Sequence, residues 1–209
     1  MEGVALDHLV WAVPDLAAGI ADLERRLGAR ATPGGRHPAW ATANALIGLG
    51  DLRYLEIVGP DPEAAPPPGS RPFLLDSLAA PRLVTWCART SDLPAMARAA
   101  ESLGIDLGEI ARRGRQRPDG VELSWTMTDP LAEREGSVIP FFIDWGANPH
   151  PAASLAPACE LISLRIEHPD TERIRASFRS LRLDVPVETG PTPRLIATLR
   201  TPRGTVELS

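Results

Sequence analysis

A short phrase recurs three times along the chain, and this internal repeat limits the possible folds more than any other feature. The copies run from Leu6-Asp7-His8 to Asp15, from Leu83-Val84-Thr85 to Asp92, and from Leu161-Ile162-Ser163 to Asp170. The third residue of each phrase lies 77 and then 78 residues after its predecessor, and the aspartate always follows it by seven. A nearly constant period, with an aspartate at the same place in each copy, indicates one structural unit used repeatedly.

Each copy begins as a strand that leads into a helix. In the first, an alternating strand at 5–13 precedes Asp15, a suitable helix N-cap, and apolar residues then recur at helical spacing up to Gly28, a natural helix stop. Residues 33–38 have the composition of a loop. The further elements that we predict are strands at 40–50, 52–58, 82–89, 109–117, 121–128, 138–145, 161–167, 194–200 and 204–208, with helices at 92–103 and 171–182.

These elements predict an α+β fold built from repeated β-α-β-β-β modules. The predicted parts are a first module at 1–59, a Pro-rich linker at 60–80, a second module at 81–146, a linker at 147–159 and an incomplete third βαββ module at 160–209. Two modules that pair edge to edge enclose a cup-shaped sheet with the helices outside. We expect the third module to cover an open sheet edge or to form a dimer contact.

Strand alternation predicts which side chains line the cup. Leu9, Trp11, Leu55, Ile57, Phe141 and Ile143 should pack under the helices. The opposite faces then carry His8, Glu56, Thr85 and Asp144. Only the first copy of the repeat has a histidine at this position. His8 is therefore a possible metal ligand that the other two copies lack.

Charge and missing motifs exclude several functions. The net charge is −5, which argues against nucleic acid or an anionic membrane as a partner. All 22 cations are arginine, so lysine Schiff-base chemistry is excluded. There is no apolar run of membrane-spanning length, and we expect a cytoplasmic protein with Cys87 and Cys159 as reduced thiols. The sequence also lacks the nucleotide-binding, serine-hydrolase and His-Glu-x-x-His metalloprotease motifs.

Five phrases resemble the vicinal oxygen chelate superfamily, and its glyoxalase-like-domain branch in particular. They are LDHLVWAVPDL, PGGRHPAWATANALIGLG, RYLEIVGPDP, RPDGVELSW and PFFIDWG. The superfamily includes glyoxalase I, extradiol dioxygenases and the fosfomycin and bleomycin resistance proteins. The resemblance covers essentially the whole chain and implies the glyoxalase/bleomycin resistance/dioxygenase fold. It does not specify the reaction, because many chemistries share this scaffold.

The resemblance also implies a divalent metal held by the first and last strands of each module. Those places hold His8, Glu56, Thr85 and Asp144, of which Thr85 is a poor ligand and puts the glyoxalase I reaction in doubt. One imidazole and two carboxylates would suit Zn²⁺, Mn²⁺, Fe²⁺, Mg²⁺ or Ni²⁺. The predicted metal ligands are therefore His8, Glu56 and Asp144, with both carboxylates also serving in catalysis.

Other polar residues are candidates for binding a substrate. Arg36 and His37 lie in the loop at the mouth of the first module, Asn44 on the next strand, and Arg117 and Trp125 in the second module. Each candidate also has a structural alternative. His8 suits a hydrogen-bonded strand histidine, Glu56 a partner of Arg36 or Arg53, and Asp144 a cap for the loop that follows it.

Two functions remain open at this level, beside a third interpretation as a degenerate scaffold whose third module mediates assembly. The first is a metal-dependent lyase or isomerase for a small substrate with neighbouring oxygens, in a chain that forms a homodimer. The second is a non-catalytic protein that binds a drug or metabolite in a metal-free cup, as the position of Thr85 would allow.

Overall fold

The computed structural model describes residues 3–116, 120, 122–132 and 134–209. The first module comprises β1 (Ala5–Ala12), α1 (Leu16–Leu27), β2 (Thr32–His37), β3 (Thr42–Gly50) and β4 (Arg53–Pro60). The second comprises β5 (Arg82–Arg89), α2 (Leu93–Glu101), β6 (Ala111–Gln116), β7 (Glu122–Met127) and β8 (Phe141–Asp144). The last part comprises β9 (Glu160–His168), α3 (Thr171–Ser180), β10 (Val187–Thr189), β11 (Arg194–Thr201) and β12 (Gly204–Leu208). Short 3₁₀ turns lie at Pro38–Trp40, Leu75–Ser77 and Pro151–Ser154.

The repeated aspartates are the N-caps of the three helices. Asp15, Asp92 and Asp170 each accept a hydrogen bond from the backbone N–H three residues further on. These bonds satisfy donors that the first helical turn leaves without a partner. Gly28 ends α1 with a φ of 70°, a backbone conformation that glycine adopts at little cost. The aspartate that recurs in each copy of the repeat is therefore a helix N-cap, as predicted for Asp15.

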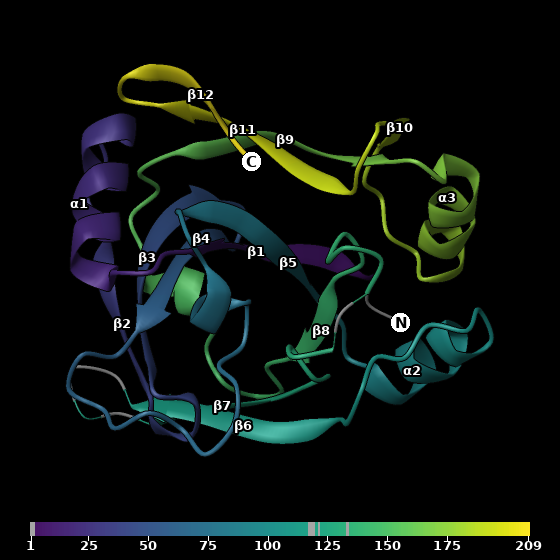
Figure 1. Cartoon of the computed structure of the whole chain (residues 1–209), viewed down its shortest axis with the longest axis horizontal. Coiled ribbons are helices and arrows are strands. Elements are labelled where there is room, and N and C mark those ends of the chain that lie inside the picture. Colours follow the sequence, from purple (N-terminus) through teal and green to yellow (C-terminus); the bar gives the residue numbers. More distant parts are fainter. Residues whose placement is uncertain (1–2, 117–119, 121, 133) are drawn as a thin grey trace.

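The first two modules close into a barrel within one chain, with strand order β1-β4-β3-β2-β6-β7-β8-β5 (Figure 1). In each module the first strand lies parallel to the last, β1 beside β4 and β5 beside β8. The modules meet along antiparallel β1 and β5 and, on the far side, through the pair Arg36 and Gln116 of β2 and β6. The predicted α+β fold with paired modules is confirmed, and the cup is a nearly closed barrel.

The last part of the chain forms a second sheet, with the order β10-β9-β11-β12. In Figure 1 its strands pass over β1 and β5, with α1 at one side and α2 and α3 at the other. Here the first strand is parallel to β10, which follows the helix directly. This order differs from that of the two barrel modules.

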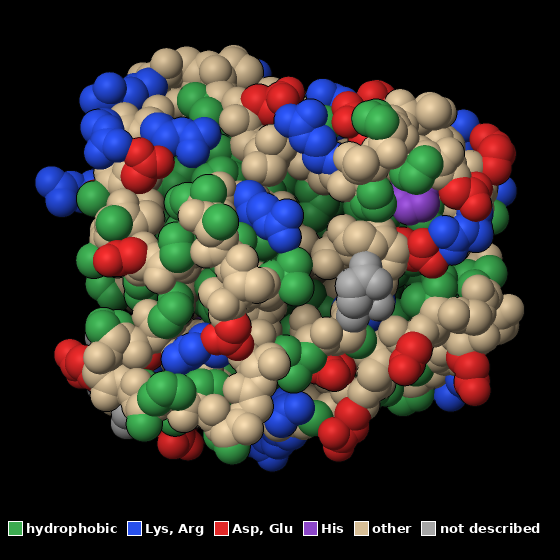
Figure 2. Space-filling view, viewed as in Figure 1, with side chains coloured by type: hydrophobic (Ala, Val, Ile, Leu, Met, Phe, Trp, Pro, Cys, Tyr) green, Lys and Arg blue, Asp and Glu red, His purple; other side chains and the backbone are tan. Residues whose placement is uncertain are grey.

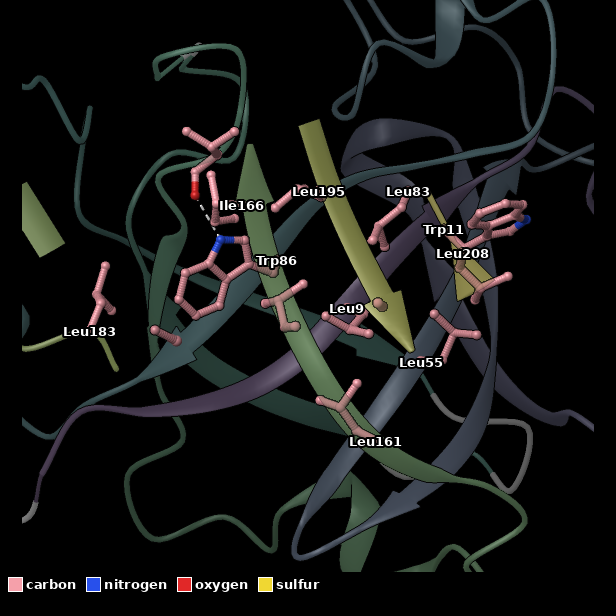
Figure 3. Close-up of a cluster of buried hydrophobic side chains, with 14 of the residues drawn as sticks. Leu9, Trp11, Leu55, Leu83, Trp86, Leu161, Ile166, Leu183, Leu195 and Leu208 are labelled. Carbon is pink, nitrogen blue, oxygen red and sulfur yellow. Dashed lines mark hydrogen bonds between the residues drawn. The ribbon is translucent and has the colours of Figure 1, made fainter. Parts of the chain in front are cut away.

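Apolar side chains gather on both sides of the barrel wall. The outer cluster includes Leu9, Trp11, Leu55 and Ile57, as predicted, and joins the second sheet through leucines and isoleucines such as Leu161, Ile166 and Leu195 (Figure 3). The inner cluster includes Phe141 and Ile143, which the sequence placed on the outer side. Phe142 faces outward instead, so the facing of β8 is reversed relative to the prediction.

The surface charge is mixed, and the described helices are short. Acidic and basic side chains are interspersed on the face in Figure 2, without a large area of one sign. Within the described ranges no helix is long and apolar enough to cross a bilayer.

Candidate functional site

A cavity inside the barrel brings polar side chains of β1 to β4 and β6 together with a ring of aromatic residues. It holds about 470 Å³ of space free of atoms, its mouth included. Its polar lining consists of His8, His37, Thr42, Asn44, Glu56 and Arg115. Its aromatic lining consists of Trp40, Tyr54, Phe73, Trp125, Phe141 and Trp145.

His8 lies between two carboxylates in this cavity. Its Nδ1 is 2.6 Å from Asp7 Oδ1, and its Nε2 is 3.6 Å from Glu56 Oε2. The His8 side chain is 5% exposed, and the ring of Tyr54 stacks on the imidazole with a centroid distance of 4.6 Å. The ring therefore has one nitrogen fixed and the other directed at a second acid.

A local irregularity of β1 explains how Asp7 reaches the same cluster. The pairing of β1 with β5 shifts between Leu6 and His8, which is the signature of a bulge. A bulge places two successive residues against one on the partner strand. Asp7 is thereby fully buried, and its Oδ2 accepts hydrogen bonds from Trp145 Nε1 at 3.0 Å and from His150 Nε2 at 2.9 Å.

These contacts control the charge of Asp7. Burial alone raises the pKa of a carboxyl group, but the hydrogen bonds from His150 and His8 outweigh it and hold the pKa of Asp7 well below its usual range. Asp7 is consequently an ionised, buried acceptor at neutral pH.

Glu56 is held from its other side by a second chain of contacts. Asn44 Nδ2 donates to Glu56 Oε1, and Asn44 Oδ1 accepts from Arg115 Nη1 at 2.9 Å. All three side chains are buried. Arg115 of the second module is thus connected through Asn44 to an acid of the first module.

His37 completes the polar wall in a different state. Its Nδ1 is 3.2 Å from Thr42 Oγ1, and burial lowers its pKa to about 4. Nearby Glu56 opposes this shift and Arg115 reinforces it. At neutral pH, His37 is an uncharged imidazole.

The structure brings together five of the residues that the sequence singled out for the site. His8, Glu56, Asn44, His37 and Trp125 all line the cavity. Arg117, predicted to bind substrate, lies outside the described residues.

Asp144 and Arg36 lie apart from this group. Because Ile143 faces inward, Asp144 lies on the other face of β8, where its Oδ1 accepts a hydrogen bond from Gly146 N at 2.8 Å. This differs from the predicted inward direction and matches the alternative of a loop cap. Arg36 instead pairs with Asp61 and Glu63, both at 2.6 Å.

Thr85 does not compensate for the absence of Asp144 from the cluster. Its hydroxyl donates to the Ser137 carbonyl at 3.3 Å, and it borders a separate hollow beside residues 70–77 and 130–139. That hollow is larger, about 950 Å³ including its mouth, but its Arg71 and Asp76 are already paired with each other. The inner cavity holds the convergent polar groups and is the better candidate site.

Asp7, Arg115 and His150 contact the site residues, although the sequence did not indicate them. Strict alternation places Asp7 on the face opposite His8. The bulge that brings both residues to one cluster has no signal in the sequence. His150 was assigned to a loop, and it does lie in one, directly before the turn Pro151–Ser154. A loop histidine acquires a role only through the tertiary contact that brings it to Asp7.

The donor atoms suit a divalent cation between His8 and Glu56. Asp7, His8 and Cys87 also offer ligand atoms within 4.8 Å of one another. However, both oxygens of Asp7 are occupied by N–H donors, and burial raises the pKa of the Cys87 thiol well above its usual value. The Nε2 of His8 and the carboxylate of Glu56 face the cavity, so a cation fits better on that side.

Barrel architecture and site position define a class of protein. Two β-α-β-β-β modules that enclose a polar cavity with a strand histidine are the arrangement of the vicinal oxygen chelate superfamily. The model of the glyoxalase-like domain matches residues 6–182, and the chain belongs to that family.

Two solved structures illustrate the likeness. A hypothetical protein from Staphylococcus aureus is 13% identical, with 94% of this chain and 91% of that chain covered and a TM-score of 0.69. Methylmalonyl-CoA epimerase from Mycobacterium tuberculosis is 20% identical, with 71% of this chain and 91% of that chain covered and a TM-score of 0.43. The first likeness shows the fold alone. No curated protein sequence matches the chain.

Proposed function

We propose that this protein is a metal-dependent lyase or isomerase for a small substrate with neighbouring oxygens. The observation that carries the proposal is the pair His8 Nε2 and Glu56 Oε2, which face each other at 3.6 Å inside a buried cavity. His8 and Glu56 would hold the cation, and substrate oxygens or water would complete its coordination. When bound, such a cation acts as a Lewis acid toward a substrate carbonyl.

The residues around this pair support proton transfer. Glu56 is oriented by Asn44, which is itself fixed by Arg115, so its carboxylate has a defined position beside the cavity. A positioned carboxylate of this kind can take a proton from carbon next to a polarised carbonyl. The surrounding aromatic side chains limit water, which strengthens the electrostatic interactions within the site.

A second candidate function is ligand binding without chemistry. Three tryptophans, Trp40, Trp125 and Trp145, line the cavity, and Trp125 and Trp145 lie 5.3 Å apart between ring centroids. Such walls suit a flat organic ligand. This candidate predicts ligand binding that persists in the presence of a strong chelator.

Metal binding is the first test of the proposal. Calorimetric titration of metal-stripped protein with Zn²⁺ or Mn²⁺ should show one equivalent bound, and His8→Ala and Glu56→Gln should lower the affinity more than the roughly 10- to 100-fold cost of an outer-shell change. Asp144→Asn is the matched control, because its carboxylate caps a loop outside the barrel, and it should bind as wild type does. Equal, near-zero metal in wild type and His8→Ala would rule out the metal site.

Catalysis is tested without knowledge of the substrate. The metal-loaded protein is incubated in D₂O with a panel of small 2-oxo acids and hydroxyketones, and deuterium exchange at carbon is followed by NMR. We expect exchange that Glu56→Gln abolishes and Asp144→Asn retains. Thermal stabilisation by panel compounds in chelator, without exchange, would favour the binding function instead.

A further inference from the structure

Asp7, which precedes His8 on β1, accepts several hydrogen bonds, and they are unequally divided between its two oxygens. Oδ1 faces His8 Nδ1 at 2.6 Å. Oδ2 faces both Trp145 Nε1 and His150 Nε2, at 3.0 and 2.9 Å. The carboxylate is fully buried, so these three N–H groups take the place of water.

The contacts of His150 determine which of its nitrogens carries the proton. The backbone N–H of Ala152 donates to His150 Nδ1 at 3.1 Å, so this nitrogen is an acceptor. In the neutral ring the proton is then on Nε2, which donates it to Asp7. An indole nitrogen is always a donor, so Asp7 Oδ2 must also accept a hydrogen bond from Trp145.

The proton of His8 follows from the same reasoning. Asp7 already accepts hydrogen bonds from Trp145 and His150 at Oδ2, so it acts as an acceptor, and the nitrogen that faces its Oδ1 is assigned as Nδ1–H. The neutral ring then carries its lone pair on Nε2, the atom that faces Glu56 and the cavity. This is the form of histidine that binds a metal ion or accepts a proton.

We propose that Asp7 is a positioning residue, held by His150 and Trp145, that accepts the Nδ1–H of His8 and so directs Nε2 into the cavity. Asp7 therefore acts through His8 and is not itself a metal ligand. His150 belongs to the segment between β8 and β9, so the barrel site is completed by a residue outside both modules. The effect of Asp7 on metal binding rests on the proposed function. The position of the His8 proton, in contrast, can be measured without metal or substrate.

Replacing Asp7 by asparagine gives a directional test. The amide has one oxygen and one NH₂ group in place of two acceptors. With its oxygen at the Oδ2 position it satisfies both Trp145 and His150, whereas with its oxygen at the Oδ1 position it satisfies His8 alone. The first arrangement is favoured, and its NH₂ group then faces His8 Nδ1. We therefore expect Asp7→Asn to move the His8 proton to Nε2.

Long-range ¹H–¹⁵N NMR of metal-free, histidine-labelled protein reads the proton position directly, and each of the four histidines can be assigned by single substitutions. Wild type should show the Nδ1–H form at His8 and Asp7→Asn the Nε2–H form, with Zn²⁺ affinity lower by about tenfold or more. If Asp7→Asn keeps the Nδ1–H form, or wild type shows the Nε2–H form, the inference is overturned.

A second set of variants tests the lock if Asp7→Asn does not fold. His150→Ala removes one of the two donors to Oδ2, and we expect several-fold weaker Zn²⁺ binding, with His150→Gln restoring most of it through its side-chain N–H. Ser154→Ala is the matched control, since it removes a hydrogen bond to the Pro151 carbonyl in the same turn without touching Asp7. Equal loss in the Gln and Ala variants, or in the Ser154 control, would contradict a positioning role.

The two proposals fail in different ways. If His8 shows the expected proton positions but no variant binds metal, the proposed metal site is wrong and the positioning role of Asp7 stands. If metal binds through His8 and Glu56 while Asp7→Asn changes neither the proton position nor the affinity, the metal site stands and the positioning role of Asp7 is wrong.

Discussion

His8 and His37 line one cavity, yet their surroundings give them different chemistry. His8 has a carboxylate at each ring nitrogen. His37 is buried, with a hydroxyl at one nitrogen and Arg115 nearby, and burial lowers its pKa to about 4. The first ring is equipped to hold a cation, whereas the second offers an uncharged hydrogen-bonding edge to a ligand.

His37 should make the stability of the fold depend on pH. In the unfolded chain its pKa is about 6.5, so between roughly pH 6.5 and pH 4 the unfolded state binds a proton that the folded state does not. The contribution of His37 is complete above this window and is lost as the pH falls through it. The slope approaches about 1.4 kcal/mol per pH unit.

Urea unfolding of wild type and His37→Gln measures this effect. Between about pH 6 and pH 5, wild type should lose roughly 1 kcal/mol more stability than the variant, which has no titrating ring at this position. Glu56 and Arg115, the charged groups that act on His37, are present in both proteins. Parallel stability curves would show that His37 does not titrate as inferred.

Individual site residues were predictable where a strand alternates cleanly. β1 and β4 alternate between polar or small and large apolar positions, and the inward direction of His8 and Glu56 follows from that pattern. β8 reads Phe-Phe-Ile-Asp, apolar on both faces, so the pattern does not fix its facing and Asp144 was assigned inward. Asp7 could not be found because a bulge shifts the alternation by one residue without a sequence signal.

At the scale of elements, β2 shows how tertiary context overrides composition. Its sequence, Thr-Pro-Gly-Gly-Arg-His, predicts a loop, but the segment pairs with β3 over most of its length and touches β6 once. Pro33 is tolerated because the pairing shifts between Pro33 and Gly35, where a bulge removes the need for a regular ladder. The barrel closes through this strand, which composition alone cannot indicate.

Gly34, the extra residue of that bulge, should be essential for the site. A Cβ at this position would overlap Asn44 Oδ1 and lie 2.5 Å from Arg115 Nη1. Both side chains are buried, so Gly34→Ala must displace the pair that orients Glu56. We expect a loss of about 1–3 kcal/mol of stability, as for other overpacked sites, together with weaker Zn²⁺ binding.

Gly69→Ala is the control for this change. A Cβ there meets no atom within 4 Å, and unfolding and metal titration should match wild type. If Gly34→Ala behaves like Gly69→Ala in both measurements, the contact between Gly34, Asn44 and Arg115 does not support the site.

At the scale of the whole molecule, the second sheet replaces solvent on the outer face of β1 and β5. Figure 3 shows Leu9, Leu83 and Trp86 of the barrel next to Leu161, Ile166 and Leu195 of the sheet. Trp86 also donates to the Val138 carbonyl at 2.8 Å, which ties this face to the segment before β8. The repeat in the sequence revealed the third copy of strand and helix, but not its strand order, because β10 has only three residues.

This shared core predicts that barrel and second sheet unfold together. Ile166 lies on β9, is fully buried and contributes to the outer cluster, so Ile166→Ala should cost about 2–5 kcal/mol through lost burial and the cavity it leaves. Ile162, on the same strand, is 45% exposed, and Ile162→Ala should cost less than about 1 kcal/mol. Urea unfolding followed by tryptophan fluorescence and by far-UV circular dichroism should give one coincident transition for both variants, shifted strongly only for Ile166→Ala. Two separate transitions, with the barrel tryptophans unaffected by Ile166→Ala, would instead mean that the sheet is an independently folding addition and that the barrel does not need it.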